Sequence, residues 1–115
     1  MKSYTIYRIE KKEILLEKAA LADSFFIRLK GLLGKKHIEE EEGMIFYPCR
    51  SIHCYGMQFP IDIVFLDDNK KILSIRENIK PGSRAHDKNA CYTIEMKAGV
   101  AAKKQLEAGE TLEIS

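Results

Sequence analysis

The sequence has no tryptophan, and its 115 residues include only three prolines and three cysteines. An odd number of cysteines fits reduced thiols better than a framework of disulfides. No apolar run approaches the roughly 18 residues that a membrane span needs. The first 12 residues lack the long apolar segment of a signal peptide. We therefore expect a cytoplasmic protein with no membrane span.

The chain also lacks a large excess of charge of either sign, because 19 basic and 17 acidic residues leave a formal net charge of +2. This balance gives no argument for nucleic-acid binding. There is no glycine-rich phosphate loop, zinc-hydrolase motif or nucleophile elbow, and we predict no cofactor. The hydrophobic content of 45% is enough for one core. With no repeat and no linker, residues 1–115 are expected to form a single domain.

Alternating and apolar segments predict an α+β fold that is mainly β, with about seven short strands. A capped helix is predicted over 23–33 and a short helix over 100–106. The absence of a regular β-α-β alternation favours a curled, mostly antiparallel sheet or partly open barrel with the first helix packed on it. The segments predicted as strands are 3–10, 14–19, 44–47, 51–55, 61–66, 71–76, 90–97 and 111–114.

Residues 61–66, I-D-I-V-F-L, predict the central strand. Both faces of such a strand would be apolar except at Asp62, so we expect burial on both sides. A buried carboxylate must be paired, hydrogen-bonded or neutral. Asp62 is therefore either a structural residue that accepts backbone N–H groups or pairs with an arginine, or a group in a ligand pocket.

The preceding segment, 49–57, contains Cys49, His53, Cys54 and Met57. Its spacing is not that of a zinc site, and we predict no metal. Neighbouring residues of a strand point to opposite faces, so His53 is poorly placed to activate Cys54 as a nucleophile. The default for all three cysteines is a small apolar residue in reduced form.

Two further segments have alternative interpretations. Residues 90–97 predict a half-exposed strand in which Thr93 and Glu95 face outward. Residues 77–89 are predicted to be a loop by composition, and His86 beside Arg84 is either solvated there or faces the site. Arg28 is either a solvated helix charge or a partner for Asp62 or a ligand carboxylate.

Five short motifs follow one another along the chain: R-L-K-G-L-L-G at 28–34, G-M-I-F at 43–46, F-P-I-D-I-V-F-L-D at 59–67, E-M-K-A-G at 95–99 and A-G-E at 108–110. Taken in this order, they resemble the motifs of the domain-of-unknown-function family numbered 192, also called uncharacterised protein family 0127. The resemblance covers nearly the whole chain and implies a compact, mainly β domain. It implies no established activity, cofactor or catalytic residue. Residues 52–57, I-H-C-Y-G-M, look like a second version of the family in which threonine is usual at the position of Cys54.

These observations favour a small binding or accessory domain. Its pocket is expected beside the central strand, where Arg28, His53, Met57 and Asp62 would converge under the 81–87 loop. The partner would be an unknown small molecule or protein. The alternative is a small enzyme that uses Asp62 and His53 as an acid–base pair. A third interpretation is that the motifs are purely structural.

Overall fold

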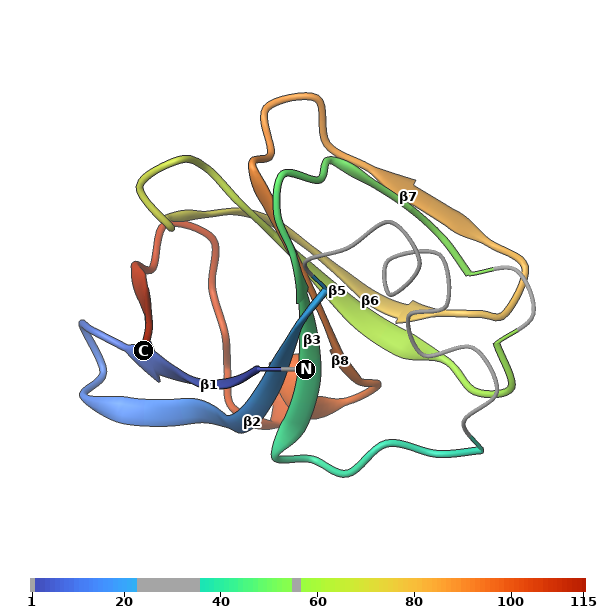
Figure 1. Ribbon diagram of the computed structural model, residues 1–115, viewed down its shortest axis with the longest axis horizontal. Helices are drawn as coiled ribbons and strands as arrows, with labels where there is room; N and C mark the ends of the chain where they lie inside the picture. Colours follow the sequence, from blue (N-terminus) through green and yellow to red (C-terminus); the bar gives the residue numbers. More distant parts are fainter. Residues whose placement is uncertain (1, 23–35, 55–56) are drawn as a thin grey trace.

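The main feature of the computed structural model, which describes residues 2–22, 36–54 and 57–115, is a curled seven-stranded sheet shaped like a half-barrel (Figure 1). The predicted helix over 23–33 lies outside the described residues, as does Arg28. No helix in the described part of the chain is long and apolar enough to cross a membrane. The sheet consists of β1 (Ser3–Arg8), β2 (Glu13–Ala22), β3 (Glu42–Phe46), β5 (Ile61–Leu66), β6 (Ile72–Ile79), β8 (Tyr92–Lys97) and β9 (Leu112–Ile114), and the other described elements are β4 (Ser51–His53), β7 (Arg84–His86) and α2 (Val100–Lys103).

The strand order of the sheet is β6-β5-β8-β3-β2-β1-β9, and its neighbours are antiparallel except for the parallel pair β2–β3. The sheet curls so far that its two edges meet at one end. There a bridge joins Lys71 to Thr111, and the N–H of Ile72 donates to the Glu110 carbonyl at 2.8 Å. These contacts confirm the prediction of a curled, mostly antiparallel sheet.

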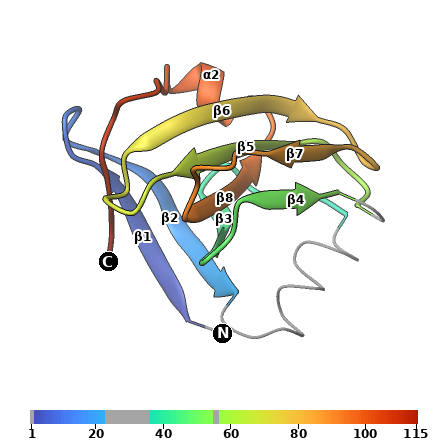
Figure 2. The ribbon, with the colours of Figure 1, turned by 90° about the horizontal axis from the view of Figure 1, so that it is seen from above.

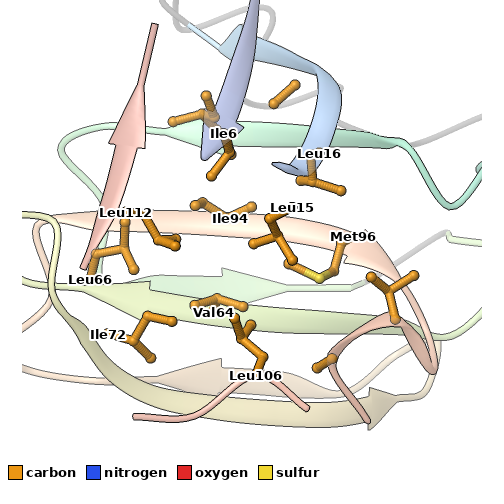
Figure 3. Close-up of a cluster of buried hydrophobic side chains, with 14 residues drawn as sticks. Ile6, Leu15, Leu16, Val64, Leu66, Ile72, Ile94, Met96, Leu106 and Leu112 are labelled. Atoms are coloured by element: carbon orange, nitrogen blue, oxygen red, sulfur yellow. The ribbon is translucent and has the colours of Figure 1, made fainter. Parts of the chain in front are cut away.

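Buried side chains form two separate clusters, one on each face of the sheet. We call them the first core, which includes Leu16, Val64 and Ile94, and the second core, which includes Phe46, Ile63 and Phe65. Figure 3 shows the first core, to which β5 contributes Val64 and Leu66. All six residues of β5 are buried, which confirms the predicted central strand.

The described part of the chain has more strands than predicted. Residues 84–86 form β7 rather than a loop, and they pair antiparallel with β4 (Figure 2). The prediction missed β7 because three residues are too few to show alternation, and a distant partner stabilises them. The short helix is also shorter than predicted and ends at Lys103.

The prediction of a half-exposed β8 is wrong, because Thr93 is 0% exposed and Glu95 is 4% exposed. Both side chains are on the face of β8 opposite Ile94 and Met96, which belong to the first core. Their face carries the second core, to which Ile52 of β4 and Ala85 of β7 contribute. The β4–β7 pair was not predicted, and its side chains contribute to the second core that covers this face of β8. The face was therefore wrongly predicted to be exposed.

Gly43 of β3 lies close to both neighbouring strands, β2 and β8. A Cβ atom at Gly43 would lie 2.6 Å from Leu16 Cδ1 and 2.7 Å from the carbonyl oxygen of Glu95. The leucine side chain can move, but the backbone oxygen belongs to β8, which pairs with both β3 and β5. Glycine at this position therefore allows the close approach of β8.

We expect Gly43→Ala to lower the free energy of unfolding by about 1–3 kcal/mol, the usual effect of overpacking. Urea denaturation measures this change. In a Leu16→Ala background the penalty should persist, because the Glu95 carbonyl is still in the way. A Gly43→Ala protein with an unchanged midpoint would show that β3 and β8 can separate at no cost.

Candidate functional site

Asp62 is buried on the first-core face of β5, the face that also carries Val64 and Leu66. Its Oδ1 accepts the N–H of Asn78 at 2.8 Å, and its Oδ2 accepts the N–H groups of Gly99 and Ala101, both at 3.0 Å. The carboxylate thereby ties β5 to the end of β6 and to the turn before α2. This geometry agrees with the structural interpretation of Asp62.

Two of these three donors belong to residues with left-handed backbone, Asn78 (φ 53°) and Gly99 (φ 96°). Asn78 lies in β6 at the register shift of the β5–β6 pair, and Gly99 lies just before α2. The carboxylate is a strong acceptor for their N–H groups. Asp62 therefore joins β5 to the irregular end of β6 and to the start of α2, and both of its oxygens are occupied.

The other described residues of the predicted pocket lie elsewhere. Met57 is in the second core, on the opposite face of β5 from Asp62. His53 of β4 has an exposed side chain, whereas Ile52 and Cys54 on either side of it are buried in the second core. The structure therefore does not bring Asp62 and Met57 together, and it does not pair Asp62 with His53. The predicted closing loop does lie beside His53, because Arg84 of β7 is its partner in the β4–β7 register.

Glu95 of β8 is the described residue that sequence reasoning missed. It pairs with Met44 of β3 on one side and Ile63 of β5 on the other, and both of these belong to the second core. Its Oε1 is buried and accepts no hydrogen bond from any residue that the structure describes. Burial raises the pKa of Glu95 to about 7. A buried, unpaired carboxyl group with a shifted pKa is typical of functional sites.

A signal for Glu95 existed in the sequence, since it is the first residue of the E-M-K-A-G motif at 95–99. Alternation along a single strand assigned it to the solvent face. In the structure the second core packs on that face, so Glu95 is buried.

Cys54 lies near Glu95 but is not activated. It is 1% exposed, and burial, followed by the negative charge of Glu95, raises its pKa to about 11. The thiol therefore stays protonated at neutral pH, which argues against a nucleophilic role. Cys49 and Cys91 are also free, and the Cys49 thiol donates to the Ser51 carbonyl at 3.3 Å. In the described ranges, no group of three or more histidine, cysteine or acidic residues is arranged to hold a metal ion.

A second buried polar cluster is centred on Arg8, which is 1% exposed. Its Nε and Nη2 donate to the two oxygens of Glu110 at 2.8 Å, and its Nη1 donates to Glu13 and to the Lys104 carbonyl. The guanidinium lowers the pKa of Glu110. A weaker bond from Nη2 to the Gln105 carbonyl at 3.4 Å occupies the remaining N–H, so this cluster is structural.

The family model of DUF192, described as "Uncharacterized ACR, COG1430", matches residues 6–114 of the chain. A UPF0127 protein of Thermococcus kodakarensis is 28% identical over an alignment of 101 residues, with 83% of this chain and 63% of that protein covered. The chain therefore spans less than two thirds of the length of this curated relative.

Two crystal structures have the same fold. A protein of unknown function from Novosphingobium aromaticivorans has a TM-score of 0.82 and is 22% identical, with 96% of this chain and 83% of that chain covered. A proposed transcription regulator from Sinorhizobium meliloti has a TM-score of 0.83 and is 21% identical, with 99% and 97% covered. Identities this low support a shared fold and nothing further.

We expect Asp62→Asn to lower the free energy of unfolding by about 2 kcal/mol or more, because three hydrogen bonds to a charged acceptor are weakened or lost. Asp68→Asn, in an exposed turn, is the matched control and should have little effect. Urea denaturation of both variants provides the comparison. An Asp62→Asn protein more stable than the wild type would instead indicate a strained functional carboxylate.

Glu95 should make the protein less stable as pH rises. Its pKa is about 7 in the folded state, above the ordinary glutamate pKa of 4.5. The folded state therefore holds a proton that the unfolded state loses, so stability is highest below about pH 4.5 and falls until pH passes about 7. The loss should be on the order of 3 kcal/mol, at about 1.36 kcal/mol for each pKa unit. Urea denaturation at pH 5 and pH 8 measures it.

The Glu95→Gln variant isolates this effect, because glutamine does not titrate. The wild type should lose more stability than the variant between the two pH values. Equal losses in both proteins would mean that the Glu95 carboxyl is solvated or paired.

Proposed function

The chain belongs to the DUF192 family, and we propose that it is a small-molecule-binding domain whose site lies beside the central strand β5, at the carboxyl of Glu95. The observation that carries this proposal is the buried Oε1 of Glu95, which has no hydrogen-bond partner among the described residues. Leaving a buried acceptor unpaired costs about 1–3 kcal/mol. A ligand that donates a hydrogen bond would remove this penalty on binding.

The surroundings of Glu95 support a ligand with an apolar body. Met44 and Ile63 flank it in the sheet, and Cys54 and Met57 belong to the same second core. Apolar walls with one polar group that sets the orientation are the usual composition of a small-molecule site. The polar part of the ligand would be a protonated amine or another strong hydrogen-bond donor, because Glu95 offers only acceptor oxygens when ionised.

This proposal retains a pocket near the central strand but replaces Asp62 with Glu95 as its polar group. An acid–base enzyme that uses Asp62 is not favoured, since both oxygens of that carboxylate accept backbone N–H groups. Nucleic acid is not proposed as the ligand, because the net charge of +2 is small for such a partner. Three free cysteines are consistent with a reducing compartment, and we propose a cytoplasmic location.

A thermal-shift screen of small apolar amines, alcohols and amides tests the proposal. A ligand at 100 times its dissociation constant should stabilise the wild-type protein by about 2.7 kcal/mol. Glu95→Gln keeps the shape of the side chain and removes its charge, so the stabilisation by amines should largely disappear. Glu113→Gln, an exposed glutamate on β9, is the matched control and should retain it. Hits that stabilise wild type and Glu95→Gln equally, or a complete lack of hits, would contradict a site at Glu95.

A further inference from the structure

We propose that the outward face of the β4–β7 sheet binds a phosphate group, and that Ser51, His53, Arg84 and His86 supply the donors. This oxyanion site is distinct from the site proposed at Glu95. The two lie on opposite sides of β4, because Cys54 faces the second core while His53 is exposed.

The register of the two strands brings these four side chains together. Ser51 pairs with His86 and His53 pairs with Arg84, while Ile52 pairs with Ala85 between them. Directly opposite residues in an antiparallel pair have Cβ atoms about 4.5–5.5 Å apart. Ile52 and Ala85 are buried in the second core, and the side chains of the other two pairs are exposed. Alternation therefore leaves a compact group of four polar side chains on one face.

Backbone hydrogen bonds extend the β4–β7 pairing at both ends, and one side chain of β6 also binds it. The N–H of Cys54 donates to the Ser83 carbonyl at 2.9 Å, and the N–H of Asp87 donates to the Arg50 carbonyl at 3.0 Å. From β6, Arg76 Nη2 donates to the His86 carbonyl at 3.1 Å. A short two-stranded sheet is marginal by itself. These bonds and the packing of Ile52 and Ala85 position it as a platform.

The charge of the platform is positive. Arg84 contributes a guanidinium, and the exposed Arg50 is next to Ser51 in the sequence. The nearest acid along β7 is Asp87, and its carboxylate is occupied by the Ser74 hydroxyl at 2.8 Å and the Asn89 N–H at 3.0 Å. Asp87 reduces the positive potential near His86 but does not occupy the face.

The donor set fits a tetrahedral oxyanion. A guanidinium presents paired N–H groups to phosphate, and an imidazole and a hydroxyl each add a single N–H or O–H. Four side chains of this size span one phosphate group rather than an extended backbone. The ligand class is therefore a small phosphorylated compound, or inorganic phosphate itself, and not a nucleic-acid duplex.

The test is a titration of ¹⁵N-labelled full-length protein, followed by amide chemical shifts. Inorganic phosphate should cause saturable shifts at residues 51–53 and 84–86. A nucleoside monophosphate should bind more tightly than inorganic phosphate if the ligand is a phosphorylated compound, and no more tightly if it is phosphate alone. Added sodium chloride should weaken binding, since the site is exposed to solvent.

Variants of two of the four residues test whether phosphate binds on this face. Arg84→Gln and His53→Gln should each weaken phosphate binding, the arginine variant by about tenfold, which corresponds to 1.4 kcal/mol. Lys11→Gln, an exposed cation on the β1–β2 turn, and Glu95→Gln should leave the affinity unchanged. Shifts that do not saturate, equal binding by Arg84→Gln, or binding of duplex DNA without binding of phosphate would overturn the proposal.

Discussion

One buried carboxylate, that of Asp62, joins three parts of the fold through the three hydrogen bonds that it accepts on the first-core face of the sheet. They connect β5 to the end of β6 and to the turn between β8 and α2, so one side chain links the strands on both sides of β5. Two of the three donors, Asn78 and Gly99, have left-handed backbone, and the carboxylate accepts their N–H groups. A neutral side chain at this position could not accept all three with similar strength.

Asp62 and Glu95 are buried carboxylates on the neighbouring strands β5 and β8, and they differ in their hydrogen bonding. In the β5–β8 register Asp62 pairs with Met96, and Glu95 pairs with Ile63. Asp62 therefore points to one face of the sheet and Glu95 to the other. The Asp62 carboxylate accepts backbone N–H groups, whereas burial among apolar side chains raises the pKa of Glu95. The stable part of the fold and the site we propose are thus separated by the thickness of one sheet.

The central strand was predictable because its signal is local. Apolar residues on both faces of 61–66, with a proline before and an aspartate turn after, indicate a strand buried on both sides. The same segment showed that the Asp62 carboxylate needs hydrogen-bond donors, but it left open whether the backbone or a ligand supplies them. The helix predicted over 23–33 and Arg28 lie outside the described residues, so the expected role of Arg28 stays a prediction.

Glu95 and the phosphate platform could not be found in this way. Alternation in a strand tells which residues share a face, but not whether a second layer covers that face. The sequence by itself determined the mainly β class, the central strand and the carboxylate in it, because these follow from the order of apolar and turn residues. Only the tertiary structure decided that β7 pairs with β4, that the second core covers Glu95, and that Arg84 lies opposite His53. Contacts between segments far apart in the chain decide these features, and neither segment carries a signal for its partner.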